Sequence, residues 1–118
     1  MSSPFPRIQS DRAISNIVWQ TVEIDNSGAS GDYTIHATPA GVRFICPHIY
    51  LHSEGAIAAT FKSGSTNISG PISIAAEEVM EVLNDGFGVF HGRLSGEDFV
   101  VNVSAAQQIN GFAVIGEL

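Results

Sequence analysis

The residues of this chain best placed by spacing to do chemistry are two histidines. His48 and His52 lie four residues apart in an apolar and aromatic segment that favours a strand. Because alternate residues of a strand point to one face, both imidazoles would share a face with Tyr50. Glu54, the next residue on that face, could supply a third metal ligand. The alternative is the polar face of an edge strand, which we favour because metal sites usually show denser clusters of ligand residues.

The other reactive side chains form no recognisable catalytic pattern. Cys46 is the one cysteine of the chain, so it has no partner for an internal disulfide, and a lone cysteine in an apolar strand is usually a small core residue. The densest acidic stretch could in principle hold paired catalytic acids, but it is more simply a solvated face or a calcium-attracting edge. Its residues are Glu77, Glu78, Glu81 and Asp85.

Sequence motifs for the common enzyme classes are missing as well. The chain has no G-x-S-x-G nucleophile elbow and no Walker loop, and the glycines over residues 86–92 have the wrong spacing for a dinucleotide fingerprint. We therefore predict that the protein is not an enzyme and uses no cofactor and no metal ion.

Length and composition predict a single β-rich domain. The chain has 118 residues, of which 44% are hydrophobic, so it can bury one compact core. Charged residues make up only 14%, against about 25% in an ordinary soluble domain. This scarcity of charge fits a neutral β protein with Ser- and Thr-rich faces, and it equally fits a surface covered by partner subunits.

The charge balance disfavours two classes of partner. The formal net charge is −7, and the sequence contains only five Lys and Arg residues. Without a basic stripe, binding to nucleic acid or to an anionic membrane surface is disfavoured. No apolar run approaches the roughly 20 residues of a membrane helix, and the first residues lack the layout of a signal peptide. We expect synthesis in a reducing compartment.

Residues 1–13 are predicted to form an extended arm ahead of the domain, which then spans residues 14–118. Pro4 and Pro6 disfavour helix in this segment. The arm is either a frayed terminus or a strand that becomes ordered only against a neighbouring subunit. The residues that would then contact the partner are Phe5, Arg7, Ile8 and Arg12.

The remaining sequence is typical of short strands separated by turns. Eight or nine such strands predict an all-β fold, a β-sandwich of jelly-roll type or a barrel. Pro47 should cause a bulge in its strand or place that strand at an edge. The turn signals at residues 84–86 and 94–97 predict that the strands flanking each turn pair as hairpins. The clearest strands are expected over residues 14–24, 33–37, 42–52, 56–62, 67–74, 99–105 and 109–116.

The last of these strands is apolar on both sides. Phe112 and Val114 fall on one face, and Ala113 and Ile115 fall on the other. Such a strand lies either in the middle of a sheet or under another subunit. Phe112 and Ile115 are therefore candidate partner contacts, and self-association as a trimer with closed cyclic symmetry is expected.

One segment is ambiguous between helix and strand. Over residues 75–84, the four apolar side chains Ala76, Val79, Met80 and Leu83 recur at helical spacing. Length and spacing alone slightly favour a helix there, although short apolar runs do not decide the question.

The second half of the sequence resembles small structural proteins of tailed bacteriophage virions. The resemblance implies a strand in place of the helix considered for residues 75–84. It also implies a compact β-sandwich, often trimeric, that decorates or cements the outer capsid surface across junctions between major capsid proteins. The protein would then be made in the host cytoplasm and reside in the virion. The segments that carry the resemblance are Phe61-Lys-Ser-Gly-Ser-Thr66, Ile68-Ser-Gly-Pro-Ile-Ser-Ile-Ala-Ala76, Asp85-Gly-Phe87, Ser95-Gly-Glu97, Val101-Asn-Val-Ser-Ala-Ala106 and Gly111-Phe-Ala-Val-Ile115.

Two alternatives to the capsid decoration hypothesis remain. A carbohydrate- or receptor-binding module of a phage fibre or tail would need an exposed aromatic platform, for which Trp19, Tyr33 and Tyr50 are a sparse supply. A hydrolase of unrecognised type is the least supported, because neither a catalytic triad nor a metal signature is present.

Overall fold

The computed structural model describes residues 17–84 and 89–118. Within these ranges the chain forms ten β-strands and no helix. This confirms the predicted all-β class, while the arm predicted for residues 1–13 lies outside the described residues. The strands are β1 (Gln20–Asp25), β2 (Gly31–His36), β3 (Phe44–Ser53), β4 (Ile57–Ser63), β5 (Thr66–Asn67), β6 (Ile72–Ile74), β7 (Glu78–Leu83), β8 (Phe90–His91), β9 (Phe99–Val103) and β10 (Ile109–Glu117).

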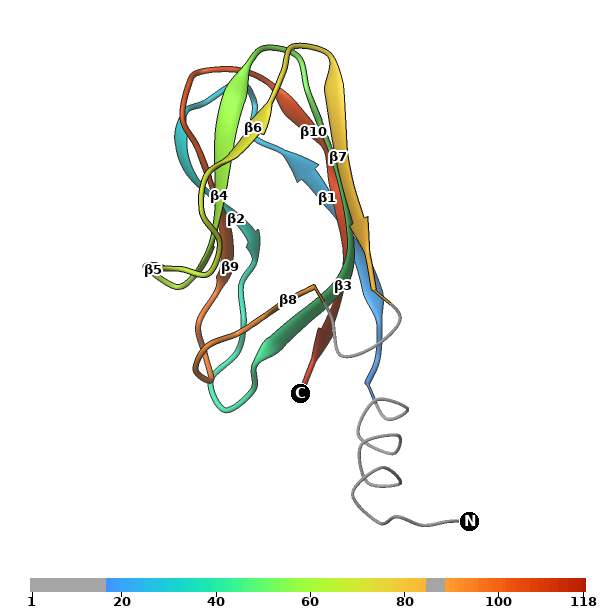
Figure 1. The fold of residues 1–118 in the computed structure, drawn as a ribbon. Coiled ribbons are helices and arrows are strands. Elements are labelled where there is room, and N and C mark those ends of the chain that lie inside the picture. Colours follow the sequence, from blue (N-terminus) through green and yellow to red (C-terminus); the bar gives the residue numbers. More distant parts are fainter. Residues whose placement is uncertain (1–16, 85–88) are drawn as a thin grey trace.

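The strands form two antiparallel sheets that pack face to face (Figure 1). In sheet A the order is β1-β10-β3-β7, and β8 pairs with β3 beyond the end of β7. In sheet B the order is β2-β9-β4-β5, and β6 also pairs with β4. The chain repeatedly crosses from one sheet to the other, which is the connectivity of a jelly roll. The β-sandwich predicted from the sequence is therefore confirmed.

The core lies between the sheets, and the clearest alternation that builds it is in β4. In β4, residues from Ile57 to Ser63 alternate between buried and half-buried. Phe99 of β9 is fully buried and stacks on Phe44 with the ring centroids 4.7 Å apart. It also contacts Phe61 and Phe90 at 5.8 and 5.6 Å. This group of four aromatic rings joins both sheets at one end of the sandwich, because Phe44 and Phe90 belong to sheet A and the other two to sheet B.

The predicted irregularity at Pro47 is present as a bulge. β10 pairs with β3 at Val114–His48 and next at Gly116–Ile45, so β3 contains one extra residue between these pairs. On the other side of β3, Pro47 separates the residues that pair with β7 from those that pair with β8. A proline is tolerated in this central strand because the ladder is interrupted on both sides at that point.

The strand implied by the virion-protein resemblance over residues 75–84 is confirmed, and the helix suggested by local spacing is wrong. β7 pairs with β3 over its six residues, and Met80 and Val82 pack against the core. The pairing with β3 and the burial of alternate apolar side chains outweigh the modest helix propensity of the glutamates.

The two hairpins predicted from turn signals are wrong. β7 and β8 do not pair with each other, since both pair with β3. β8 and β9 belong to opposite sheets, and β9 pairs with β2 and β4. Turn residues mark where the chain changes direction, but they do not show which strand the next one pairs with. Here β8 joins the same neighbour as β7, and the chain then passes to the other sheet before β9.

Candidate interaction surface

The outer face of sheet A is the surface on which side chains of a chemically distinct kind collect. Alternate residues of β1, β10, β3 and β7 pack inward, which leaves the intervening ones on the solvent side. The strand register aligns these outward residues in rows. We call this surface the outer face; its residues are Thr21, Glu23, Asp25, Asn110, Phe112, Val114, His48, Tyr50, His52, Val79, Glu81 and Leu83.

Aromatic side chains occupy the middle of the outer face. Phe112 lies directly opposite Tyr50 in the register, and their rings are parallel within 5° with centroids 5.6 Å apart. The imidazole of His48 meets the Phe112 ring edge-on at 5.1 Å. All three side chains are half-buried. Beyond this cluster, Val79 and Leu83 of β7 are 43% and 64% exposed. The centre of the sheet thus presents aromatic and aliphatic surface to solvent.

The histidines of the outer face are paired with glutamates of β7 and of the turn before it. Nε2 of His48 lies 2.8 Å from Oε2 of Glu81, and Nε2 of His52 lies 3.5 Å from Oε2 of Glu77. The prediction that His48 and His52 share a face is confirmed. The metal alternative required Glu54 as a third ligand, but among the described residues no group of three or more His, Cys, Asp and Glu is arranged to hold a metal ion.

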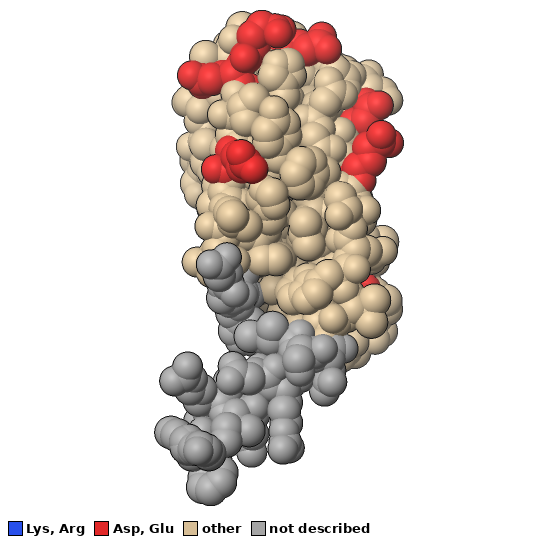
Figure 2. Space-filling model, turned by 90° about the vertical axis from the view of Figure 1, so that its right-hand side faces the viewer, with Lys and Arg blue, Asp and Glu red and all other residues tan. Residues whose placement is uncertain are grey.

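The margins of the outer face carry carboxylates, while its centre is uncharged. Figure 2 views the side of the molecule on which β7 and β1 lie in Figure 1, and acidic side chains appear there at the top, along the right-hand edge and in one group left of centre. No described Lys or Arg is visible on this side. The exposed acidic residues of β1, of β7 and of the turn before β7 are Glu23, Asp25, Glu77, Glu78 and Glu81.

The chain enters sheet A across one end of the outer face. A side chain at Gly116 would collide with Ile17 and with the Trp19 ring, which lies 2.7 Å from the position of its Cβ. The missing side chain therefore lets Ile17 and Trp19 lie directly on β10. Ile17 is buried there, whereas Trp19 is 38% exposed.

The partner-contact residues predicted from the sequence fall in three places. Phe112 lies on the outer face, where a partner could reach it. Ile115 is 0% exposed and belongs to the core, so in this structure it is not available to a partner. Its strand is central, between β1 and β3, which explains why both of its sides are apolar. Phe5, Arg7, Ile8 and Arg12 lie outside the described residues.

The part of the surface that sequence reasoning missed is the pairing of Tyr50 with Phe112 and of His48 with Glu81. Tyr50 and Phe112 are 62 positions apart in the sequence, and His48 and Glu81 are 33 positions apart. Alternation identified the face of each strand, but no local signal indicated which strands are neighbours.

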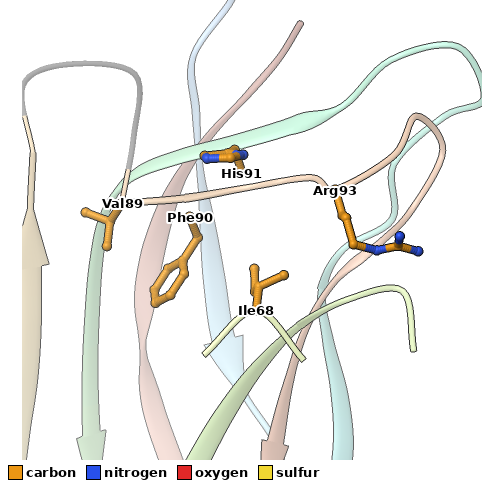
Figure 3. Close-up of a pocket in the computed structure, with 5 residues that line it drawn as sticks. All are labelled: Ile68, Val89, Phe90, His91 and Arg93. Carbon is orange, nitrogen blue, oxygen red and sulfur yellow. The ribbon is translucent and has the colours of Figure 1, made fainter. Parts of the chain in front are cut away.

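A second feature is a small hollow beside β8. It has a volume of about 180 Å³ and is lined by Ile68, Val89, Phe90, His91 and Arg93. In Figure 3 the side chain of Phe90 points down and that of Ile68 points up beside it, while Arg93 lies to one side. The guanidinium of Arg93 is 3.1 Å from Glu97. The lining is mainly apolar and includes neither a hydroxyl nor a thiol nucleophile.

Cys46 is a core residue, as its sequence context predicted. It is 0% exposed and packs within the hydrophobic core. Burial raises the pKa of its thiol to about 12, so the reactive thiolate is a negligible species near neutral pH.

Comparisons with known proteins indicate a fold relationship. No family model and no curated protein matches the sequence. Among solved structures, a chain from the Bacillus endospore appendages, which form a novel family of disulfide-linked pili, has a similar fold. The TM-score is 0.51 with 21% sequence identity, and the match covers 86% of each chain. At this identity the likeness concerns the fold alone. Among the described residues, no helix has the length and apolarity needed to cross a bilayer.

Proposed function

We propose that this protein is a non-enzymatic structural subunit that works by binding other protein subunits through its surface. The observation that carries the proposal is the outer face of sheet A, where half-buried Phe112 and Tyr50 stack at the centre and Leu83 is exposed on β7. Contiguous apolar surface rimmed by polar residues is typical of protein-protein contact sites. The jelly-roll sandwich supplies a rigid scaffold for such a surface.

The specific role that we propose is decoration of a bacteriophage capsid. The support is the resemblance of residues 61–118 to virion structural proteins, together with the low charge content of 14%. In this role a homotrimer binds the outside of the head across neighbouring major capsid proteins. A ligand that binds the assembled lattice and not the dissociated subunits stabilises the lattice by mass action.

Co-sedimentation with capsids tests this role. The purified protein is mixed with expanded capsids assembled from the major capsid protein encoded in the same genome. We expect saturable binding to capsids, absence of binding to free capsid subunits, and a higher temperature of capsid disruption. If the protein stays in the supernatant at every concentration, it does not decorate that capsid.

A second candidate role is that of a subunit of a surface appendage, which the fold similarity to a pilus protein favours. The pili that those endospore appendages form are disulfide-linked. Cys46 is buried, so a covalent link of that kind would need a thiol that this chain does not present. Assembly would therefore be non-covalent. Electron microscopy of concentrated protein without capsids distinguishes the two roles, because an appendage subunit forms filaments and a decoration protein forms a closed oligomer.

Binding of a carbohydrate or another receptor is the remaining alternative. Trp19 and Tyr50 belong to the sheet A side of the molecule, whereas Tyr33 lies in β2 of sheet B, so these three aromatic residues do not form one platform. Glycan-array binding that is lost in Tyr50→Ala would favour this alternative over a structural role.

A further inference from the structure

We propose that the outer face of sheet A is the binding site for residues 4–12 of a second copy of the same chain. The proposal rests on the self-association proposed above and identifies the surface and the segment that produce it. In this arrangement residues 4–12 of one copy are the donor segment, and the outer face of the next copy is the acceptor surface.

The acceptor surface combines apolar and acidic chemistry. Phe112 and Tyr50 give the centre a stacked aromatic pair, and Val114 extends it toward the end of β10. Glu23 is exposed on one side, and Glu81 lies on the other with its side chain 49% exposed. A segment that binds here must therefore carry apolar side chains for the centre and positive charge for the margins.

Residues 4–12 have that composition, and the other cations of the chain are mostly engaged. Lys62 is 3.1 Å from Asp32, and Arg93 is 3.1 Å from Glu97. Arg7 and Arg12 are two of the five basic residues in the sequence, and they stand beside Phe5 and Ile8. Pro4 and Pro6 restrict the backbone of the segment, which lowers the entropy lost on binding.

Two copies whose outer faces contacted each other would bring acidic side chains together. The margins of both faces carry carboxylates, such as Glu23 and Glu81, and no described Lys or Arg is visible on this side (Figure 2). Such a symmetric contact would place like charges opposite one another, which is unfavourable. The charge pattern favours an arrangement in which one copy gives the segment and the other gives the face.

The direction of the chain favours a second copy over the same copy as the donor. Ile17 lies at Gly116, and β1 then runs antiparallel to β10, from Ile115 toward Asn110. From Ile17 onward, β1 therefore runs toward the centre of the outer face. In the opposite direction, toward residue 16, the chain runs away from that centre. A segment of the same chain would have to reverse direction to return to Phe112, whereas a segment from a neighbour needs no reversal.

Complementation between two variants tests the proposal. One variant lacks residues 2–12 and keeps an intact outer face, and the other carries Phe112→Asp and keeps its N-terminal residues. We expect the full-length protein to self-associate and each variant alone to be about tenfold or more weaker in self-association. Mixed in equal amounts, the two should form a complex of two chains, because one supplies the segment and the other the face. Light scattering measures the mass against the 12.5 kDa of one chain.

Further variants separate this inference from a loss of folding. Because Phe112→Asp could weaken the sheet, the double change Glu23→Lys with Glu81→Lys provides a second way to disable the face. Pairing this double variant with Arg7→Glu and Arg12→Glu in the same chain should restore association, since the charges are then exchanged. Leu94→Asp, which alters an exposed apolar residue away from the outer face, serves as the control and should associate like the original protein.

The outcomes distinguish this inference from the proposed function. If the protein without residues 2–12 associates as strongly as the full chain, the folded body makes the contacts, and the inference is overturned while self-assembly stands. If both variants and their mixture remain single chains although the full protein associates, the segment binds its own face or another surface, and the inference is likewise overturned. If the full protein is a single chain at all concentrations but still sediments with capsids, the second copy is excluded and capsid decoration remains.

Discussion

At the scale of single residues, the side chain of Asn26 in the turn after β1 makes four hydrogen bonds to backbone groups. It is 6% exposed. Its amide nitrogen donates to the carbonyl oxygens of Ala29 and Gln107, both at 2.8 Å. Its side-chain oxygen accepts from the backbone nitrogens of Gly28 and Ile109, at 3.1 and 2.9 Å. One buried amide thus holds the β1–β2 turn against the start of β10.

Replacing this residue should be costly. Asn26→Ala leaves the buried backbone nitrogen of Ile109 and partly buried backbone groups of the turn without these partners. We expect a loss of about 1–3 kcal/mol in the free energy of unfolding. Asn67→Ala changes an exposed asparagine of β5 and should stay within about 0.5 kcal/mol of the original protein. Urea unfolding followed by fluorescence compares the two. Equal stability of both variants would show that water replaces the Asn26 contacts.

The carboxylates of Asp25 and Asp32 should make stability depend on pH. The amide of Gln108 donates to Asp25 at 2.7 Å and, with the backbone nitrogen of Ser27, lowers the pKa of that carboxyl. The amide of Asn102 donates to Asp32 at 2.8 Å and, with Lys62, lowers the pKa of that carboxyl too. A carboxyl whose pKa is lower in the folded protein stabilises the fold above its unfolded pKa, and the contribution disappears as the pH falls through the folded value.

We therefore expect the protein to lose stability as the pH falls below the ordinary aspartate value of 3.8. Asp32→Asn should flatten this part of the profile, because the side chain no longer titrates. Asn102→Ala should flatten it in the same way while keeping the carboxyl, since it removes the largest cause of the lowered pKa. Thermal melting between pH 2 and 6 measures the slopes. An unchanged slope in both variants would mean that the hydrogen bonds to Asp32 do not persist in solution.

At the scale of the elements, the packing of β10 against β3 sets a tight limit at Gly111. A Cβ added there would overlap the backbone carbonyl of Tyr50 and approach Leu51 Cα at 3.2 Å. Backbone atoms in a central ladder cannot move aside as the end of a side chain can. Glycine in a strand interior often marks such a close approach of another backbone.

Gly111→Ala should consequently destabilise the sheet by about 1–3 kcal/mol or more, the usual cost of overpacking. Gly70→Ala is the matched control, because nothing lies within 4 Å of the position of its Cβ. Midpoints of chemical denaturation decide the comparison. A Gly111→Ala midpoint equal to that of Gly70→Ala would mean that β10 shifts away from β3 without cost.

At the scale of the whole molecule, the one-directional contact inferred for the outer face and the proposed homotrimer together predict a closed ring. If each copy gives its N-terminal segment to the next, three copies satisfy every segment and every face in a cyclic trimer. Light scattering at micromolar concentration should then give about three times the 12.5 kDa of the chain. The trimer should weaken as salt rises, because part of the attraction is between Arg7 or Arg12 and exposed carboxylates. A monomer unaffected by salt would contradict this prediction.

The sequence by itself determined the class of fold and the face to which most side chains point. Alternation placed Phe99, Val101 and Val103 inside, and it placed His48 and His52 on one face, because successive side chains of a strand point to opposite sides. The effect of Pro47 was also predictable, since it follows from the missing backbone donor of proline. These properties are local, so neighbouring residues suffice to predict them.

Only the tertiary structure decided which strands are neighbours. The turn signals predicted hairpins on either side of β8, but sheet order follows from burying every apolar face at once. β7 and β8 instead pair with β3 in the same sheet, and the chain crosses to the other sheet between β8 and β9. The same pairing made residues 78–83 a strand, buried Ile115 in the core, and brought Phe112 to Tyr50. Contacts between distant residues depend on the energy of the complete sandwich, so no local pattern reveals the outer face as one surface.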